Sequence, residues 1–223
     1  MRMKRICLFL VCFLAFLSFL WSEEVSKTTS KEKYRKFSAK LNFLGEPLLA
    51  GKAGSGTNPP GYGEAFRPGI GGGFEIGFSF HPRHQAFIGY EDKNHNGRVF
   101  EGVKFSRRKI TMVYAGWRMN LLTALEASLK PYLKLEIGTA SLNKMEIVYH
   151  DIHHDYWDSS RVLMVRAGVG IELILFDWKP YSNGVFIEIK GQYLGKPPSL
   201  MSPHSDSGGC WSLPISFGLS FNL

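Results

Sequence analysis

Apolar and polar residues alternate along the chain from about residue 37 to its end. Large apolar side chains occupy every second position, as in the run Leu163-Met-Val-Arg-Ala-Gly-Val-Gly-Ile-Glu-Leu173. A period of two places successive side chains on opposite faces of a β-strand. Segments with this pattern cover residues 37–43, 74–80, 86–90, 113–119, 132–138, 163–173, 185–189 and 213–223. The pattern therefore predicts an all-β chain with eight strands.

The two faces of these strands differ in the size of their side chains. The polar face is rich in Gly and Ser, whereas the apolar face is bulky throughout. Small residues suit the crowded interior of a narrow barrel, and a bulky apolar exterior suits lipid. Aromatic residues recur near the predicted strand ends, as in outer-membrane barrels: Phe43, Tyr90, Trp117, Phe176, Tyr193, Trp211 and Phe221. We predict an eight-stranded antiparallel transmembrane up-and-down β-barrel, with a secreted lipocalin-like binding barrel as the alternative.

The connections between the predicted strands alternate in length. Residues 45–67, 92–108, 143–161 and 195–210 form long connections, whereas 82–84, 122–128 and 177–183 are short. Long outer loops and short periplasmic turns are typical of outer-membrane barrels. Residues 99–105 alternate as well, so the second long loop is expected to be a hairpin that extends two strands beyond the membrane.

The N-terminus has the layout of a secretory signal peptide. The positively charged segment Met1–Arg5 precedes an apolar stretch from Ile6 to Trp21, which is short for a spanning helix. We predict a signal peptide at 1–22, an N-terminal periplasmic segment at 23–34 and the barrel at 35–223; an uncleaved anchor is the alternative. Cleavage removes Arg2, Lys4 and Arg5 and lowers the net charge from +8 to +5.

Composition and cysteine content narrow the functional classes. With 44% apolar and 21% charged residues, neither a disordered chain nor a polytopic helical membrane protein is expected. Cys7 and Cys12 lie in the signal, so Cys210 alone remains. This excludes an intrachain disulfide and a cysteine zinc site. Basic residues are scattered, so no nucleic-acid partner is expected.

Charged residues fall on the face predicted to point into the barrel. An eight-stranded barrel is only wide enough for its own side chains, and buried charges need partners. We predict a lumen charge network that plugs the barrel; a narrow gated path for small solutes is the alternative. The predicted members are Lys36, Lys40, Glu75, Glu91, Arg118, Lys134, Glu136, Arg166, Glu172, Glu188 and Lys190.

The loops contain no motif from which we predict a catalytic, cofactor or metal site. Residues 149–158 hold three His and three Asp, which could chelate a divalent cation only if the loop made them converge. Gly69–Gly73 opens a strand instead of a helix, which argues against a phosphate loop. The strand at 189–194 lacks the His-x-Ser pair of lipid A deacylases. We expect no enzyme and no cofactor, with a lipid A-modifying enzyme as the alternative.

Three segments resemble the small outer-membrane barrels of the OmpA/OmpW type. These are Pro131-Tyr-Leu-Lys-Leu-Glu-Ile-Gly138, Arg166-Ala-Gly-Val-Gly-Ile-Glu172 and the C-terminal run from Ser216, although the last residue is Leu223 where Phe is usual. The resemblance implies location in the outer membrane of a Gram-negative cell and a structural or porin-like, small-solute transport role, with outer loops that bind a ligand or partner. It also implies contact with outer-membrane lipid and lipopolysaccharide, a monomeric state, and assembly by the barrel-assembly machinery. The implied assembly signal consists of Phe217, Leu219, Phe221 and Leu223.

Overall fold

A computed structural model describes residues 36–53, 60–122, 128–178, 181–196 and 208–223, with the side chains of 154–156 excepted. The predicted signal peptide at 1–22 and the segment at 23–34 lie outside the described residues.

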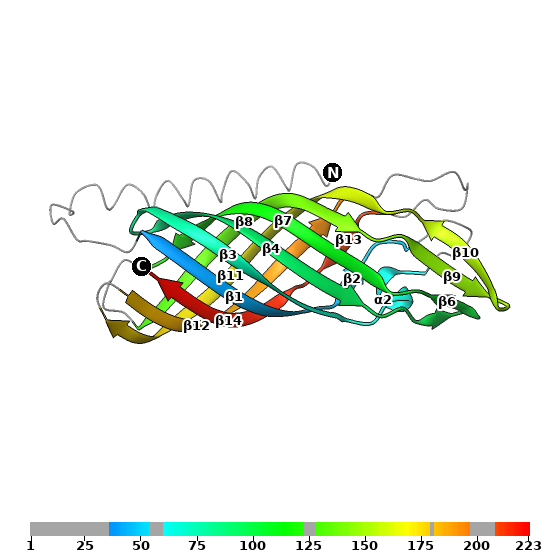
Figure 1. The fold of residues 1–223 in the computed structure, drawn as a ribbon, viewed down its shortest axis with the longest axis horizontal. Helices are drawn as coiled ribbons and strands as arrows, with labels where there is room; N and C mark the ends of the chain where they lie inside the picture. Colours follow the sequence, from blue (N-terminus) through cyan, green and yellow to red (C-terminus); the bar gives the residue numbers. More distant parts are fainter. Residues whose placement is uncertain (1–35, 54–59, 123–127, 179–180, 197–207) are drawn as a thin grey trace, which may run out of the picture. The chain divides into compact units, whose positions relative to one another are not determined.

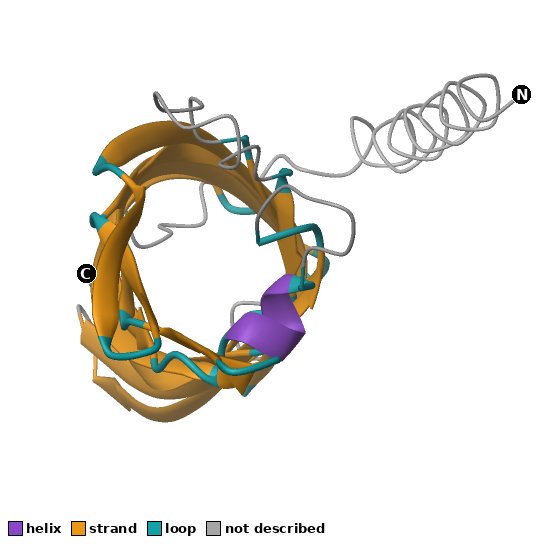
Figure 2. Cartoon of the chain, turned by 90° about the vertical axis from the view of Figure 1, so that its right-hand side faces the viewer, coloured by secondary structure: helices purple, strands orange, loops and turns teal. Residues whose placement is uncertain are grey.

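Eight antiparallel strands close into a ring (Figures 1 and 2). Each strand pairs with the next, and the last pairs with the first, which leaves no open edge in the ring. The fold predicted from the alternation is therefore confirmed. The strands are β1 (Phe37–Glu46), β3 (Gly69–His81), β4 (His84–His95), β7 (Arg108–Asn120), β8 (Leu129–Leu142), β11 (Ser160–Trp178), β12 (Tyr181–Leu194) and β14 (Ile215–Asn222).

The bulky apolar positions point outward over most of the barrel. Phe43, Ile88 and Val169 leave 62%, 62% and 56% of their surface exposed, and many further apolar side chains do the same. Such a wall cannot face water and matches the lipid-facing surface of a transmembrane barrel. The interior is crowded, as expected. A Cβ at Gly89 would lie 2.4 Å from the ring of Tyr114, and one at Gly170 would lie 2.5 Å from the ring of Tyr132.

The last predicted strand, 213–223, begins two residues later in the structure, as β14 at Ile215. Leu213 and Pro214 separate it from a short preceding strand, β13 (Cys210–Ser212), which was not predicted. β13 pairs with β2 (Leu48–Ala50), which Pro47 separates from β1 in the same way. Proline has no backbone N–H to donate to a ladder. Pro47 and Pro214 therefore interrupt the two neighbouring strands at the same level. The Leu213 N–H instead donates to the Pro47 carbonyl at 3.2 Å.

The long loops form a second, smaller sheet beyond one end of the barrel. It contains β5 (Val99–Phe100), β6 (Val103–Phe105), β9 (Met145–Tyr149) and β10 (Ile152–Trp157), in the order β10-β9-β6-β5. The hairpin predicted at 99–105 therefore exists, but it joins this sheet and does not prolong two barrel strands. The short helix α2 (Tyr62–Ala65) lies at the same end, opposite the C-terminus (Figure 1). None of the described helices is long and apolar enough to cross a membrane.

Near this outer end, strands β7 and β8 reverse their polarity. On β7, Ile110 and Met112 point inward and are fully buried, whereas Lys109 on the same strand is exposed. β8 repeats this, with Ala140 and Leu142 buried and Ser141 exposed. A barrel that stands in water has an apolar interior and a polar exterior. The reversal on these strands therefore marks where they leave the membrane, and the sequence-based picture of a polar interior was wrong for them. On β4, however, Lys93 and His95 remain buried and inward beside Ile110 and Arg108.

Candidate functional site

The barrel interior below the outer cap holds equal numbers of opposite charges. Six carboxylates and six cations of the described strands face inward there, and each leaves at most 5% of its surface exposed. Seven of the eight barrel strands contribute a charged group, and β14 contributes Ser216, whose hydroxyl lies 3.5 Å from Glu188. The carboxylates are Glu46, Glu75, Glu91, Glu136, Glu172 and Glu188, and the cations are Lys40, Lys93, Arg118, Lys134, Arg166 and Lys190.

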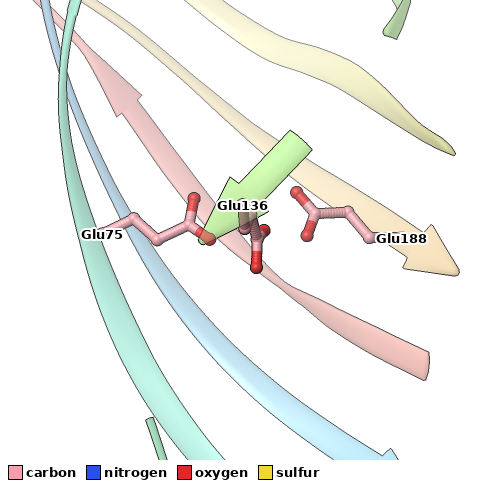
Figure 3. Close-up of side chains that lie close together, drawn as sticks. All are labelled: Glu75, Glu136 and Glu188. Carbon is pink, nitrogen blue, oxygen red and sulfur yellow. The ribbon is translucent and has the colours of Figure 1, made fainter. Parts of the chain in front are cut away.

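The centre of this lumen network is a group of three carboxylates. Glu75, Glu136 and Glu188 point toward one another from β3, β8 and β12, with oxygen atoms within 4.8 Å of each other (Figure 3). The ammonium of Lys134 lies 2.6, 3.2 and 3.3 Å from them in that order, and that of Lys190 lies 3.1 Å from Glu136 and 2.9 Å from Glu188. Two ammonium groups therefore neutralise the position that a metal cation would need, and the chemistry here is ion pairing.

Toward the C-terminal end of the barrel, the network continues through an aromatic ring. The Tyr132 hydroxyl donates to Glu188 at 2.7 Å, and Lys40 pairs with the same carboxylate at 3.0 Å. The guanidinium of Arg118 lies 3.8 Å from the centre of the Tyr132 ring and pairs with Glu172 at 2.6 Å. The tyrosine thus connects two ion pairs that do not touch directly.

Toward the outer end, a single arginine joins two carboxylates to a glutamine. Arg166 pairs with Glu91 at 2.7 Å and with Glu136 at 2.9 Å, and its Nε donates to Gln192 at 2.7 Å. The Gln192 side chain accepts from Lys93 at 3.1 Å and donates to Glu46 at 2.7 Å. Lys93 and Glu46 also form a direct ion pair. The network therefore runs without interruption from the C-terminal end to the outer end of the lumen.

An apolar cap covers the outer end of the network. Loop residues Ala53, Tyr62, Ala65 and Phe66 are at most 1% exposed and pack in one cluster with the inward apolar ends of β7, β8 and β11. This outer cap also buries Cys210, and burial raises the pKa of its thiol to about 11. The outer cap is therefore an apolar cluster that adjoins the charged lumen network.

One arginine lies inside the outer cap, surrounded by aromatic rings. The guanidinium carbon of Arg108 is 4.5 Å from the ring centre of Tyr62, 5.2 Å from Trp157 and 5.8 Å from Phe66. These rings come from two different long loops, and Arg108 begins β7. Cation–π contacts of this kind strengthen when desolvated. Arg108 therefore fastens both loops to the barrel wall.

The structure places every predicted network residue in the lumen except Lys36. Lys36 is exposed because it precedes β1, whose first buried inward residue is Ser38. The sequence analysis missed Glu46, Lys93 and Arg108, and also His95, which is fully buried 3.7 Å from Glu46. Lys93 and His95 continue the parity of Glu91 along β4, so this signal was present within a stretch assigned to a loop.

The structure also places the implied assembly signal and the His- and Asp-rich loop. The implied assembly signal faces outward, with Phe217, Leu219, Phe221 and Leu223 exposed by 59%, 47%, 38% and 50%. The His- and Asp-rich loop forms the β9–β10 hairpin, in which His153 lies 3.7 Å from Glu146. The only group of metal-ligating type among the described residues is the lumen carboxylate group. His204 and Ser205 lie outside the described residues.

Comparison with known proteins identifies the fold. No family model and no curated relative matches the chain. Among solved structures, the chain is similar to Neisserial surface protein A, with 11% identity, a TM-score of 0.54, and 86% of this chain and 100% of that chain covered. It is also similar to the outer membrane protein OprG from Pseudomonas aeruginosa, with 10% identity, a TM-score of 0.56, and 86% and 97% of the two chains covered. The chain therefore has the fold of the small eight-stranded outer-membrane β-barrels.

Proposed function

We propose that the protein is a non-enzymatic, monomeric outer-membrane barrel whose closed barrel anchors a folded outer platform. The outer platform consists of α2 and the four-stranded sheet β10-β9-β6-β5. Its role is structural and binding: the barrel holds the platform above the membrane, where it presents a surface to a ligand or partner.

The observation that carries this proposal is the filled lumen under the outer cap. Twelve buried charges pair with one another across the bore, and aromatic loop residues close the outer end. A diffusion channel needs screened and hydrated charges around a water column. Charges buried to this extent are retained only when they are paired and hydrogen-bonded, which makes them a rigid plug.

Two steps of biogenesis belong to the same proposal. The apolar N-terminal stretch directs export and is cleaved after residue 22, and the barrel-assembly machinery recognises the outward residues of the last strand. The alternation of Phe217, Leu219 and Phe221 on the lipid-facing side of β14 supports the second step.

Conductance across a planar lipid bilayer tests the closed-barrel function. The refolded protein should give no stable open-channel current, whereas a porin refolded in parallel gives one. A steady current whose ion selectivity changes in the Glu136→Gln variant would overturn the proposal and establish small-solute transport. A variant of the exposed outer residue Asp158, Asp158→Asn, serves as the control, because it removes a charge outside the lumen.

A further inference from the structure

Arg108 is a buried cation that pairs with no carboxylate of the described residues. It is 1% exposed, and its Nε and Nη1 atoms are buried without a hydrogen-bond partner in the described part of the chain. These two nitrogens carry three of the five N–H donors of an arginine side chain. Six carboxylates already balance the six cations of the lumen network, so the charge of Arg108 is in excess. A buried charge without a partner is strongly unfavourable, which points to an anion from outside the described residues.

The polar neighbours of Arg108 do not supply this negative charge. Glu46, the carboxylate at this end of the lumen, is paired with Lys93. The thiol of Cys210 interacts with the guanidinium, but burial raises the pKa of this thiol to about 11, so the thiol stays neutral at physiological pH. His95 is the register partner of Arg108 on β4, and imidazole carries no negative charge in its neutral or its protonated form.

We infer that the outer cap binds a small organic anion, a monocarboxylate with an apolar body, whose carboxylate pairs with Arg108. A guanidinium is planar and can bind a carboxylate through two parallel N–H groups. The rings of Tyr62, Phe66 and Trp157, with centres 4.5 to 5.8 Å from the guanidinium carbon, offer apolar contacts to the rest of the molecule. This inference goes beyond the proposed anchoring role, because it assigns a ligand class to the interior of the outer cap.

The surroundings of the guanidinium favour an organic anion over an inorganic one. Tyr62, Phe66 and Trp157 belong to one buried apolar cluster, which also contains the fully buried Met145. Chloride or phosphate would lose its hydration there and gain a single cation in return. A carboxylate with an apolar body loses less, since that body leaves water for apolar surroundings. A single excess cation also matches a singly charged ligand better than a doubly charged one.

The segment that carries α2 gives access to the guanidinium. α2 contains four residues and lies at this end of the barrel (Figure 2). Isolated bridges attach the segment on its two sides, between Gly61 and Lys52 and between Phe66 and Gly97. Segments held by few backbone hydrogen bonds open at a low cost in free energy. Displacement of this segment therefore uncovers Arg108 while the barrel strands stay paired.

Calorimetric titration with benzoate tests the inference. The full chain is folded in phosphatidylcholine nanodiscs, and the heat of titration into empty nanodiscs is subtracted to remove partitioning into lipid. Saturable binding at one site per chain is expected. Arg108→Gln should weaken this binding at least about 10-fold, because it removes a charge-assisted pair. Arg108→Lys, which keeps the charge and loses the planar fork, should weaken it as well. The matched control Arg98→Gln removes an exposed cation of the outer platform and should change binding by less than about two-fold.

Three further ligands and one stability measurement identify the chemistry that is recognised. Benzyl alcohol has the same ring without the charge and should bind at least about 10-fold more weakly than benzoate. Chloride and inorganic phosphate, each at the benzoate concentration, should not compete with benzoate. Saturating benzoate should raise the urea midpoint of unfolding of the wild type and leave that of Arg108→Gln unchanged, because a ligand stabilises only the folded state that binds it.

Several results would overturn the anion site. These are no saturable heat with the folded wild type, equal weakening by Arg98→Gln, equal affinity for benzyl alcohol, and competition by chloride or phosphate. Folding of each variant is checked by migration of unboiled samples on gels. If Arg108→Gln does not fold, Arg108→Lys replaces it, and an unchanged benzoate affinity in that variant overturns the site. Ion conductance through a chain that binds benzoate would refute the proposed closed barrel alone.

Discussion

At the scale of single residues, the protein depends on the pairing of buried charges. Glu136 contacts Lys134 at 3.2 Å, Lys190 at 3.1 Å and Arg166 at 2.9 Å. The Glu136 side chain is 1% exposed, so water has little access to these ion pairs. Glu91, Glu75 and Glu188 are their remaining partners, and each already accepts a hydrogen bond from a tyrosine hydroxyl.

The variant Glu136→Gln is therefore expected to destabilise the barrel strongly. Removing one member of a buried pair costs about 3–5 kcal/mol, because an uncompensated charge remains. We expect a clear fall in the urea midpoint of unfolding in lipid vesicles. Asp158→Asn, at an exposed loop position, should move that midpoint by less than about 0.5 kcal/mol. An unchanged midpoint for Glu136→Gln would mean that water screens the lumen charges, as in an open pore.

At the scale of elements, the last strand closes the ring through its outward apolar side chains. β14 pairs with both β1 and β12, and Phe217 lies opposite Phe43 on one side and Ile187 on the other. Phe221 faces the same way but lies one residue from the inner end of β14. The two positions therefore differ in depth within the same strand.

A carboxylate on this strand should block insertion according to its depth. A charge on the lipid face costs about 2–4 kcal/mol at the midplane for Arg or Lys, less for Asp, and close to zero near the interfaces. Phe217→Asp should therefore reduce the folded fraction in liposomes more than Phe221→Asp, with Phe217→Leu as an apolar control. The shift in migration of unboiled samples reports this fraction. Equal losses at both positions would show that recognition of the strand, and not its depth, controls insertion.

At the scale of the whole molecule, the barrel has two zones with opposite polarity. Its membrane zone has an apolar wall around paired charges, and its outer zone has a polar wall around the apolar outer cap. Closed barrels with every backbone group paired are kinetically and thermally robust in membranes. This architecture predicts both where the protein is found and how it behaves on gels.

The mature chain is expected to fractionate with the outer membrane and to migrate differently before and after boiling. The physical reason is that the closed ladder of eight strands survives detergent at room temperature and unfolds only on heating. Gel electrophoresis of membrane fractions with and without boiling checks this, with a soluble periplasmic protein as the control. Recovery as a soluble monomer that boiling does not shift would instead favour the lipocalin-like barrel.

The sequence by itself determined the strands, their two faces and the closed ring. A period of two is a local property, so segments such as 163–173 report their own conformation and which residues share a side. The inward direction of Lys134, Glu136 and Arg166 followed from the same alternation. The alternation did not determine the strand ends, because it continues past Glu91 into residues that were assigned to a loop.

The tertiary structure alone decided which charges meet and what closes the barrel. Lys40 and Glu188 lie 148 residues apart in the chain, and only the register of the closed ring places them at 3.0 Å. Likewise, Tyr62 and Phe66 come from one long loop and Trp157 from another, and their packing around Arg108 has no local signature. The polarity reversal near Ile110 is of the same kind, because the level at which strands leave the membrane depends on how long each one is within the assembled barrel. Periodicity depends on residues that are neighbours in the chain, whereas contacts across the barrel interior form only when the ring of strands closes.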